Sequence, residues 1–546
     1  MNTRKLVLSI GLGAMLTVGL LVGFSLGGAS AIASSTNLQV SDLKSPSNAI
    51  RAQEAVSSAH IVVVLSGEKA AVRAITWTGT ISRVTGLELA GFDVENSGDA
   101  VCGIEGEGCP ASDCFCDDNN WWQGVWDASS TQWDSSGWPP ADLRDGDVVG
   151  FHNGAAWKPP VLPAPSYVGA FDALDWLRQQ QQADGSFGTP NYTAEVLMGV
   201  SANGVDGSTW SSSPSLLANV LSNGAAFASS NAAGAGKLAV ALTAQESCWP
   251  IGAPSPLDHY YPTSGTFSVD TLYQAWGILG TATLSDTIPV SAVQSLKASQ
   301  QANGGWELFA GFGTDTNSTA LALQALVAAG EPVTSTSIVS GLTYLEKAQN
   351  ADGGFPYSPD SPWGTDSDTN STAYVVQALF ATDEDPLTGT WSVTSSNPIS
   401  YLLSMQLDDG SFEWQTGFGS DQIATQQAIP ALLHRPVPMR VDDLDACYGI
   451  SGQVVGGVDD SASPLTGVGI EAAGAGDQFF ATAGADGAYT ISVQAADTYT
   501  LTPCKEGFVF TPTVQSVEVA GAPGTVASAL EFAGETYVYL PLVVRQ

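Results

Sequence analysis

A repeat with a period near 50 residues constrains the fold of this chain more than any other feature. A Gln, an Asp-Gly or Asn-Gly pair and an aromatic residue recur in that order in four segments, 182–187, 301–306, 349–355 and 406–412. Between them, a polar segment at 315–320 returns at 368–373, 53 residues further on, and Gln324 and Gln377 keep the same offset. Such a period predicts supersecondary units that stack on one another.

Each repeat predicts two helices joined by a tight turn. The Gly of the first motif breaks a helix because Gly tolerates positive φ. Ser and Thr of the second motif are natural N-caps, and the next helix continues through Leu321–Leu326. A helical hairpin cannot bury its apolar face alone, so the units must stack in a ring or a solenoid.

The Gln-x-x-Asp-Gly-x-aromatic repeats resemble the QW motifs of squalene and terpene cyclases and of prenyltransferase subunits. That resemblance covers about half of the chain and implies an α/α toroid, a double ring of helices, over residues 166–437. The expected fold class is multi-domain α and β. A central α/α toroid of helical hairpin repeats is expected between an N-terminal small β-rich domain and a C-terminal β-sandwich.

Residues 58–154 predict the small β-rich domain. His60–Leu65 is an apolar run typical of a strand, and Asp145-Gly146 supplies a turn before a second strand. With its Trp-rich stretch, this segment resembles the small β domain of the cobalamin carriers transcobalamin and intrinsic factor. The Pro-rich segment 155–165 predicts a stiff linker to the toroid.

Residues 438–535 predict a β-sandwich, because polar and apolar residues alternate between Gly/Asp turns. Ile450–Val454 and Asp486–Tyr489 carry a resemblance to carboxypeptidase-regulatory domains, which commonly serve as spacers. The tail 536–546 has two interpretations, an edge strand or a sorting signal.

The N-terminus and the overall charge favour export. Arg4 and Lys5 precede a long uncharged apolar stretch, so residues 1–33 predict a signal peptide, with an uncleaved membrane anchor as the alternative. Residues 34–57 are Ser/Ala-rich and predict a linker. Seventeen basic and 54 acidic residues give a net charge of −37, which repels nucleic acid and anionic surfaces. A secreted or cell-surface location is expected.

The cysteines agree with an oxidising compartment. The disulfide candidates are a cluster of four and a pair that brackets the C-terminal strands: Cys102, Cys109, Cys114, Cys116, Cys447 and Cys504. A zinc site in the cluster is the alternative, although the C-x2-C spacing is lacking. Cys248 stands alone and is expected to be a buried free thiol.

Known catalytic motifs are absent from the toroid sequence. Terpene cyclases supply the acid that protonates the substrate through an Asp-x-Asp-Asp motif, and the nearest acidic runs, 366–369 and 383–385, fit a helix cap and a turn better. Prenyltransferases hold zinc with Asp, Cys and His, and Cys248 lacks the Asp-x-Cys pattern. No catalytic residue and no metal ligand is therefore assigned, and the balance is against an enzyme.

Polar caps that recur around one rim favour binding instead. Ser268–Thr271 and Asn317–Leu326 resemble the inner-helix starts of the cobalamin carriers, and the Trp residues of the β-rich domain could cover a planar ligand. The alternative is that the polar groups only cap helices and that the Trp residues fill a core. The candidate ligand-binding residues are Asp270, Thr271, Asp315, Asn317, Thr319, Gln324, Asp368, Asn370, Thr372, Gln377, Thr425, Gln426, Trp121 and Trp122.

These features predict an extracellular, non-catalytic protein that captures cobalamin or another bulky ligand between the toroid and the β-rich domain. No cofactor is required, and cobalamin enters only as a bound ligand. The expected partner is a small molecule, with no nucleic acid and with membrane contact only through the N-terminal segment or surface anchoring. The alternatives are a terpene-cyclase or prenyltransferase-like enzyme that acts on isoprenoids and a structural surface protein.

Overall fold

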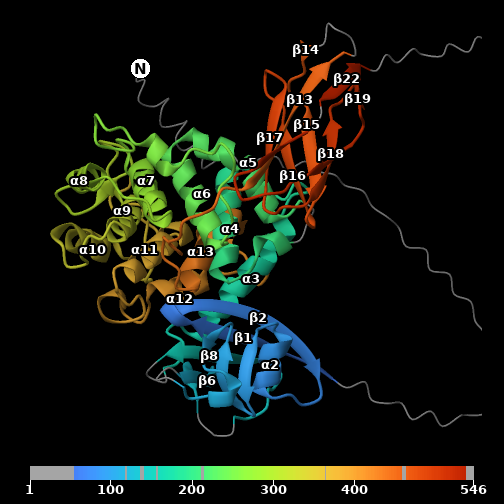
Figure 1. The fold of residues 1–546 in the computed structure, drawn as a ribbon. Coiled ribbons are helices and arrows are strands. Elements are labelled where there is room, and N and C mark those ends of the chain that lie inside the picture. Colours follow the sequence, from blue (N-terminus) through green and yellow to red (C-terminus); the bar gives the residue numbers. More distant parts are fainter. Residues whose placement is uncertain are drawn as a thin grey trace, which may run out of the picture. The chain divides into compact units, whose positions relative to one another are not determined.

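The computed structural model describes residues 55–116, 120–135, 140–154, 158–210, 214–362, 364–457, 463–529 and 531–536 (Figure 1). The expected signal peptide, most of the expected linker 34–57 and the tail beyond residue 536 lie outside the described residues. Mixed α and β structure is confirmed. The predicted domain boundaries stay predictions.

The N-terminal β-rich segment forms a five-stranded sheet in the order β2-β1-β8-β6-β7. Strand β1, which lies between β2 and β8, is apolar on both faces because each face packs on a different neighbour. Ile61 and Val63 pack on helix α2 (Arg83–Leu89), whereas Val62 and Val64 join the core of the helical part. The strands are β1 (Val56–Leu65), β2 (Lys69–Thr78), β6 (Asn120–Asp127), β7 (Gln132–Asp134) and β8 (Asp147–Gly154).

Two disulfides fix a small three-stranded sheet beside this one. Cys102 pairs with Cys114 and Cys109 with Cys116, which confirms the disulfide prediction for the cluster and excludes zinc as its role. The strands are β3 (Val94–Ser97), β4 (Ala100–Ile104) and β5 (Glu107–Gly108). No group of three or more His, Cys, Asp or Glu residues in the described ranges is placed to hold a metal.

Eleven helices of the described chain, α3 to α13, form two layers of a closed ring (Figure 1). Each inner helix packs on two inner neighbours, and α13 closes the ring by packing on α4. The inner helices are α4 (Pro190–Ala202), α6 (Ala232–Ala244), α7 (Thr271–Thr283), α9 (Thr316–Ala328), α11 (Thr369–Ala381) and α13 (Gln422–Leu432). The outer helices are α3 (Ala164–Gln180), α5 (Leu216–Ser230), α8 (Val290–Ala298), α10 (Thr336–Ala348) and α12 (Pro398–Ser404). None of the described helices is both long and apolar enough to cross a membrane.

The repeated Gln holds the turn between an outer and an inner helix. Its side-chain N–H donates to the carbonyl of the Gly four residues on, at 3.0, 2.8, 3.0 and 3.0 Å, from Gln181, Gln300, Gln349 and Gln406. In the first two repeats this Gln lies one position before Gln182 and Gln301, with which the sequence pattern begins. Gln300, Gln349 and Gln406 also bond the neighbouring repeat, so the motif joins units as well as closing turns.

A threonine in the first turn of the next helix completes each unit. The backbone N–H of the motif's aromatic residue donates to the hydroxyl of Thr193, Thr319, Thr372 or Thr425, at 3.0, 3.0, 2.9 and 2.9 Å. Each hydroxyl in turn donates to the carbonyl of the residue that caps its helix. Both hydrogen-bonding functions of these threonines are therefore used by the fold.

The C-terminal strands form two sheets. One has the order β14-β13-β22-β19, with β17 and β21 also paired to β13, and the other has the order β16-β15-β18-β20. Their bounds are β13 (Tyr448–Gly456), β14 (Ser463–Pro464), β15 (Gly469–Gly474), β16 (Asp477–Thr482), β17 (Ala488–Val493), β18 (Thr498–Cys504), β19 (Phe508–Thr511), β20 (Gln515–Glu518), β21 (Val526–Ser528) and β22 (Phe532–Thr536). The short strands β9 (Trp306–Glu307), β10 (Thr314–Asp315), β11 (Phe412–Glu413) and β12 (Ser420–Asp421) make two hairpins in the ring.

The remaining cysteines pair differently from the sequence-based prediction. Cys248 is not a free thiol, because it forms a disulfide with Cys447 that joins the ring to the C-terminal strands. Cys504 is exposed and free, so its assignment as a disulfide candidate is wrong. The two partners lie 199 residues apart in sequence, and only the folded chain brings them together.

Candidate functional site

The six inner helices form a closed ring, and residues at the same position from their starts lie at about the same depth in it. The sixth residues of the six helices define what we name the axial layer: Glu195, Lys237, Trp276, Leu321, Tyr374 and Gln427. Direct contacts connect Glu195 to Lys237 and Gln427, and Lys237 to the Trp276 ring. Glu195 and Tyr374, from helices that are not neighbours, interact electrostatically across the axis.

A buried ion pair dominates one side of the axial layer. The side chains of Lys237 and Glu195 are about nine-tenths buried and in direct contact, and the Lys237 ammonium also donates to Asn191 Oδ1 at 2.8 Å. The second carboxylate oxygen of Glu195 accepts N–H groups from Gln426 and Gln427, at 2.7 and 3.1 Å. Burial raises the pKa of Glu195, but the ammonium and the two amides outweigh burial, so the pKa lies below its ordinary value. Glu195 is therefore a carboxylate at neutral pH.

The other side of the axial layer is aromatic and apolar. Trp276, Leu321 and Tyr374 come from α7, α9 and α11, and the Lys237 ammonium lies 5.1 Å from the Trp276 ring centroid. Burial, together with the negative charge of Glu195, raises the pKa of Tyr374, so its hydroxyl stays protonated. Lys237 and Trp276 approach closely because Gly236 and Gly280 let α6 and α7 pack backbone to backbone.

The segment after α13 packs into the ring near the C-terminal ends of the inner helices. The backbone N–H of Val437 donates to Gln324 Oε1 at 2.9 Å, and Val437 is buried in the core of the ring. Gln377 holds the same place on α11 as Gln324 on α9, but its side-chain N–H donates to its own helix, at Ala373, over 3.3 Å. Neither amide lies in the axial layer.

The predicted rim residues serve the fold. Asp315 and Asp368 cap α9 and α11 by accepting the backbone N–H of Ser318 and Ser371, at 2.6 and 2.7 Å. Burial raises the pKa of Asp315 to about 7 and that of Asp368 to about 6. Both carboxyls therefore hold a proton to higher pH than an exposed aspartate does.

The remaining predicted residues lie in different surroundings. Thr271 is buried at the start of α7, and burial raises the pKa of the half-buried Asp270 before it. Asn317 accepts a hydrogen bond from Thr316 at 3.3 Å. Asn370 donates to Gln427 at 2.8 Å, so of the predicted residues it and Gln426 contact the axial network directly.

The two predicted Trp residues do not meet the ring axis. Trp121 is buried in the core between the sheet and α2, and Trp122 lies edge-on to Trp133. Sequence reasoning missed Glu195, Lys237, Trp276 and Tyr374. Their common position in the inner helices is the signal that would have found them, once the helix starts are aligned at their caps.

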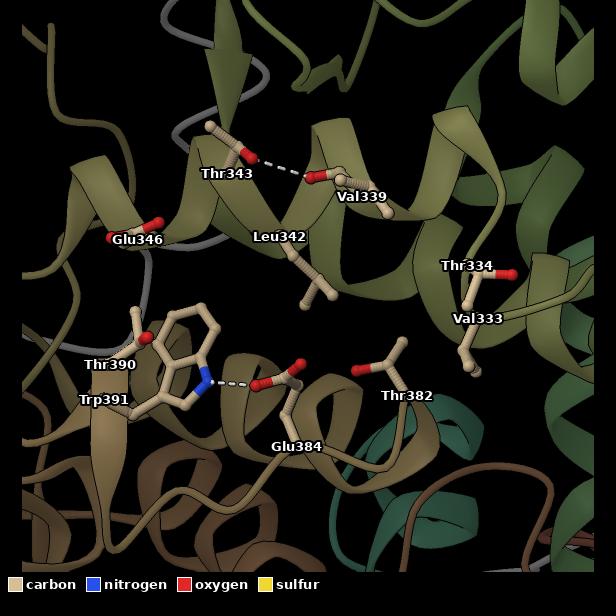
Figure 2. A pocket seen from close by; sticks show the side chains of 10 residues that line it. All are labelled: Val333, Thr334, Val339, Leu342, Thr343, Glu346, Thr382, Glu384, Thr390 and Trp391. Carbon is tan, nitrogen blue, oxygen red and sulfur yellow. Dashed lines mark hydrogen bonds between the residues drawn. The ribbon is translucent and has the colours of Figure 1, made fainter.

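A surface pocket of about 390 Å³ lies elsewhere on the ring, between α10 and the loop after α11 (Figure 2). Trp391 and Glu384 lie in its wall, and the Trp391 indole N–H donates to the Glu384 carboxylate at 2.9 Å. Trp391 is only 3% exposed, so its ring offers no stacking surface to a ligand. The axial layer remains the stronger candidate because it combines charge, amides and aromatic rings.

Comparison with known proteins gives a family match for part of the ring. Residues 268–423 match the family model of the squalene-hopene cyclase C-terminal domain. Among solved structures, the type II terpene cyclase MstE from Scytonema is 15% identical, with a TM-score of 0.36 over 50% of this chain and 99% of that one. The ent-copalyl diphosphate synthase from Streptomyces platensis is 19% identical, with a TM-score of 0.33 over 44% and 50%. A search among curated proteins finds no match.

The α/α ring that the repeats predict is thus confirmed, and its residues 268–423 are similar to the squalene-hopene cyclase C-terminal domain. The expectation of a non-catalytic carrier of cobalamin is wrong, because the matching family is a cyclase domain. The physical reason for the error is that Thr319, Thr372 and Thr425, taken as ligand groups, are saturated by the turns they hold. The family match covers neither the β-rich segment nor the C-terminal strands.

Proposed function

We propose that the helical ring is the catalytic part of a terpene-cyclase-like enzyme, which folds an isoprenoid chain against the axial layer. The observation that carries the proposal is the match of residues 268–423 to the squalene-hopene cyclase C-terminal domain. Those residues contain α7, α9 and α11, and with them the aromatic and apolar side of the axial layer.

The axial layer has groups suited to a cationic intermediate. Cyclisation by protonation adds a proton to one carbon–carbon double bond and passes the positive charge along the chain until a proton is lost. Aromatic rings such as those of Trp276 and Tyr374 attract a cation through their π faces. An ionised carboxylate in a water-poor site, such as Glu195, stabilises positive charge more strongly than it would in water.

Three buried carboxyls of the described ring are candidates for the proton transfer: Glu195, Asp315 and Asp368. Asp315 and Asp368 hold a proton at higher pH because burial raises their pKa values to about 7 and about 6. Glu195 is ionised beside Lys237 and is suited to stabilise the cation or to accept the final proton.

The test is product formation by the purified full chain. Squalene, geranylgeraniol and geranylgeranyl diphosphate are incubated with it separately, and extracts are analysed by gas chromatography and mass spectrometry. We expect a cyclic product from at least one of them and a loss of about 100-fold in rate in Glu195→Gln. No cyclic product from any of the three would overturn the proposal.

Matched substitutions identify the proton donor. Asp315→Asn and Asp368→Asn keep a good N-cap but cannot donate a carboxylic proton, so a loss of product in one of them marks the donor. Asp421→Asn is the control, because Asp421 caps α13 through the same bond, to Ala424 N at 2.7 Å, and should leave the rate unchanged.

A further inference from the structure

The axial layer is divided into a polar and an apolar half, and this division limits what the ring binds. The polar half, from α4, α6 and α13, holds Glu195, Lys237 and Gln427. The apolar half, from α7, α9 and α11, holds Trp276, Leu321 and Tyr374. We infer that the ligand of this site is an isoprenoid with a hydroxyl head group, and the isoprenoid part of this inference rests on the proposed function.

Gln426 provides an independent observation that points to a hydrogen-bond donor on the ligand. Its side chain is 1% exposed, and its N–H group donates to Glu195 at 2.7 Å. That bond fixes the orientation of the amide, and within the described residues its Oε1 atom has no hydrogen-bond partner. A buried acceptor without a partner costs about 1–3 kcal/mol, so a ligand O–H that meets it is favoured.

Trp276 presents a complementary group from the apolar half. Its side chain is 2% exposed, and its indole N–H also lacks a partner among the described residues. A Trp N–H is a donor only, so it accommodates an oxygen or a π-bond of the ligand and not another N–H group. Among the described residues, one buried acceptor beside Glu195 and one buried donor of the apolar half thus lack a hydrogen-bond partner.

The charges argue against two other ligand classes. A hydrocarbon would leave the Gln426 acceptor unsatisfied and would remove water from the Glu195–Lys237 pair without replacing any hydrogen bond. A diphosphate would bring several negative charges beside Glu195, which accepts the only ammonium of the axial layer. The net charge of −37 adds to that repulsion at long range. A neutral hydroxyl avoids both costs.

The inner helices are less buried towards the rim where they begin. The second residues of the inner helices lie one turn nearer this rim, and most of them are half-buried, whereas four of the six sixth residues are more than nine-tenths buried. Those second residues are Asn191, Ala233, Leu272, Asn317, Asn370 and Ile423. Burial therefore increases from this rim, where three of the six residues are Asn, to the axial layer, and a ligand with one polar group matches that gradient.

The experiment compares four probes of equal chain length by binding, not turnover. Geranylgeraniol, its methyl ether, the corresponding hydrocarbon and geranylgeranyl diphosphate are titrated into the full chain, and intrinsic tryptophan fluorescence gives each Kd. The ether keeps the oxygen acceptor but lacks the O–H donor. We expect the alcohol to bind about tenfold or more tightly than the ether and the hydrocarbon, and the diphosphate to bind most weakly.

A variant and its control assign the effect to Gln426. In Gln426→Met the preference for the alcohol over the ether should fall to about onefold, whereas Gln377→Met, in an amide that bonds only its own helix, should retain it. Circular dichroism confirms folding, and the alcohol-to-ether ratio in the unmodified chain decides the question if Gln426→Met does not fold. Equal Kd values in the unmodified chain, a preference that survives in Gln426→Met, or no binding of any probe would overturn the inference. Alcohol binding without product would overturn only the proposed function.

Discussion

Removal of the Lys237 ammonium tests the axial network directly. In Lys237→Met the side chain keeps its approximate length, but Glu195 remains as a buried carboxylate without its counter-charge. Loss of one partner from a buried ion pair costs about 3–5 kcal/mol, because an uncompensated charge stays in a low-dielectric site. If Glu195→Gln is added, the charge disappears, and we expect most of that loss to be recovered. The coupling energy of the cycle should therefore exceed about 2 kcal/mol.

The same variant should invert the pH dependence of stability. In the native chain, burial raises and Lys237 and the amides lower the pKa of Glu195, with a net value below the ordinary 4.5. A pKa depressed by folding gives stability that is present above pH 4.5 and is lost as pH falls through the folded value. Without Lys237, burial is expected to raise this pKa, so Lys237→Met should become more stable as pH falls from neutrality towards 4.5.

The assay is urea unfolding of the full chain, followed by near-ultraviolet circular dichroism at several pH values. Lys297→Met is the matched control, because Lys297 pairs with Glu331 where its own side chain is 37% exposed. A surface pair of this kind contributes at most about 1 kcal/mol. The reasoning is refuted if Lys237→Met costs no more than Lys297→Met, or if the double variant loses as much as the two single variants together.

Three further predictions concern the turns, the caps and the disulfides. Thr319→Val removes the acceptor of the Trp306 backbone N–H and should cost about 1–3 kcal/mol by urea unfolding. Thr343→Val, at a half-buried residue whose hydroxyl bonds only its own helix, should cost less than about 0.5 kcal/mol. Burial raises the pKa of Asp315 from 3.8 to about 7, so between these pH values the native chain binds more protons than the unfolded one. The free energy of unfolding therefore falls as pH rises across that window. Asp315→Asn should flatten this fall when urea unfolding is repeated at several pH values. Thiol titration of the unfolded, unreduced chain should find one free thiol, that of Cys504. Any further thiol would contradict the pairing.

The sequence was sufficient to predict the ring because its local signals repeat. The Gly and aromatic residues at 304–306, 353–355 and 410–412 mark turns through conformations that depend on neighbours in sequence. The four cluster cysteines were recognised as disulfide candidates because they lie close together in sequence, but their pairing, over 12 and 7 residues, came only from the structure. Cys248 and Cys447 could not be paired in this way, because 199 residues separate them and the closure of the ring determines their distance.

The axial layer was missed for the same reason. Glu195 lies 42 residues from Lys237 and 231 from Gln426, and its charge on a helix is typical of a solvated face until α13 packs on α4. The stretch between the first two copies of the motif, which contains Glu195, is also degenerate. The pattern therefore drew attention to the caps, which recur between copies because every helix needs them. In a ring of similar units, residues that recur in all copies hold the scaffold together, whereas positions that differ between copies can give each wall of the site its own chemistry. The sixth residue of the inner helices changes from Glu to Lys, Trp, Leu, Tyr and Gln around this ring, and it is there, not at the repeated caps, that substitutions should alter what the protein binds.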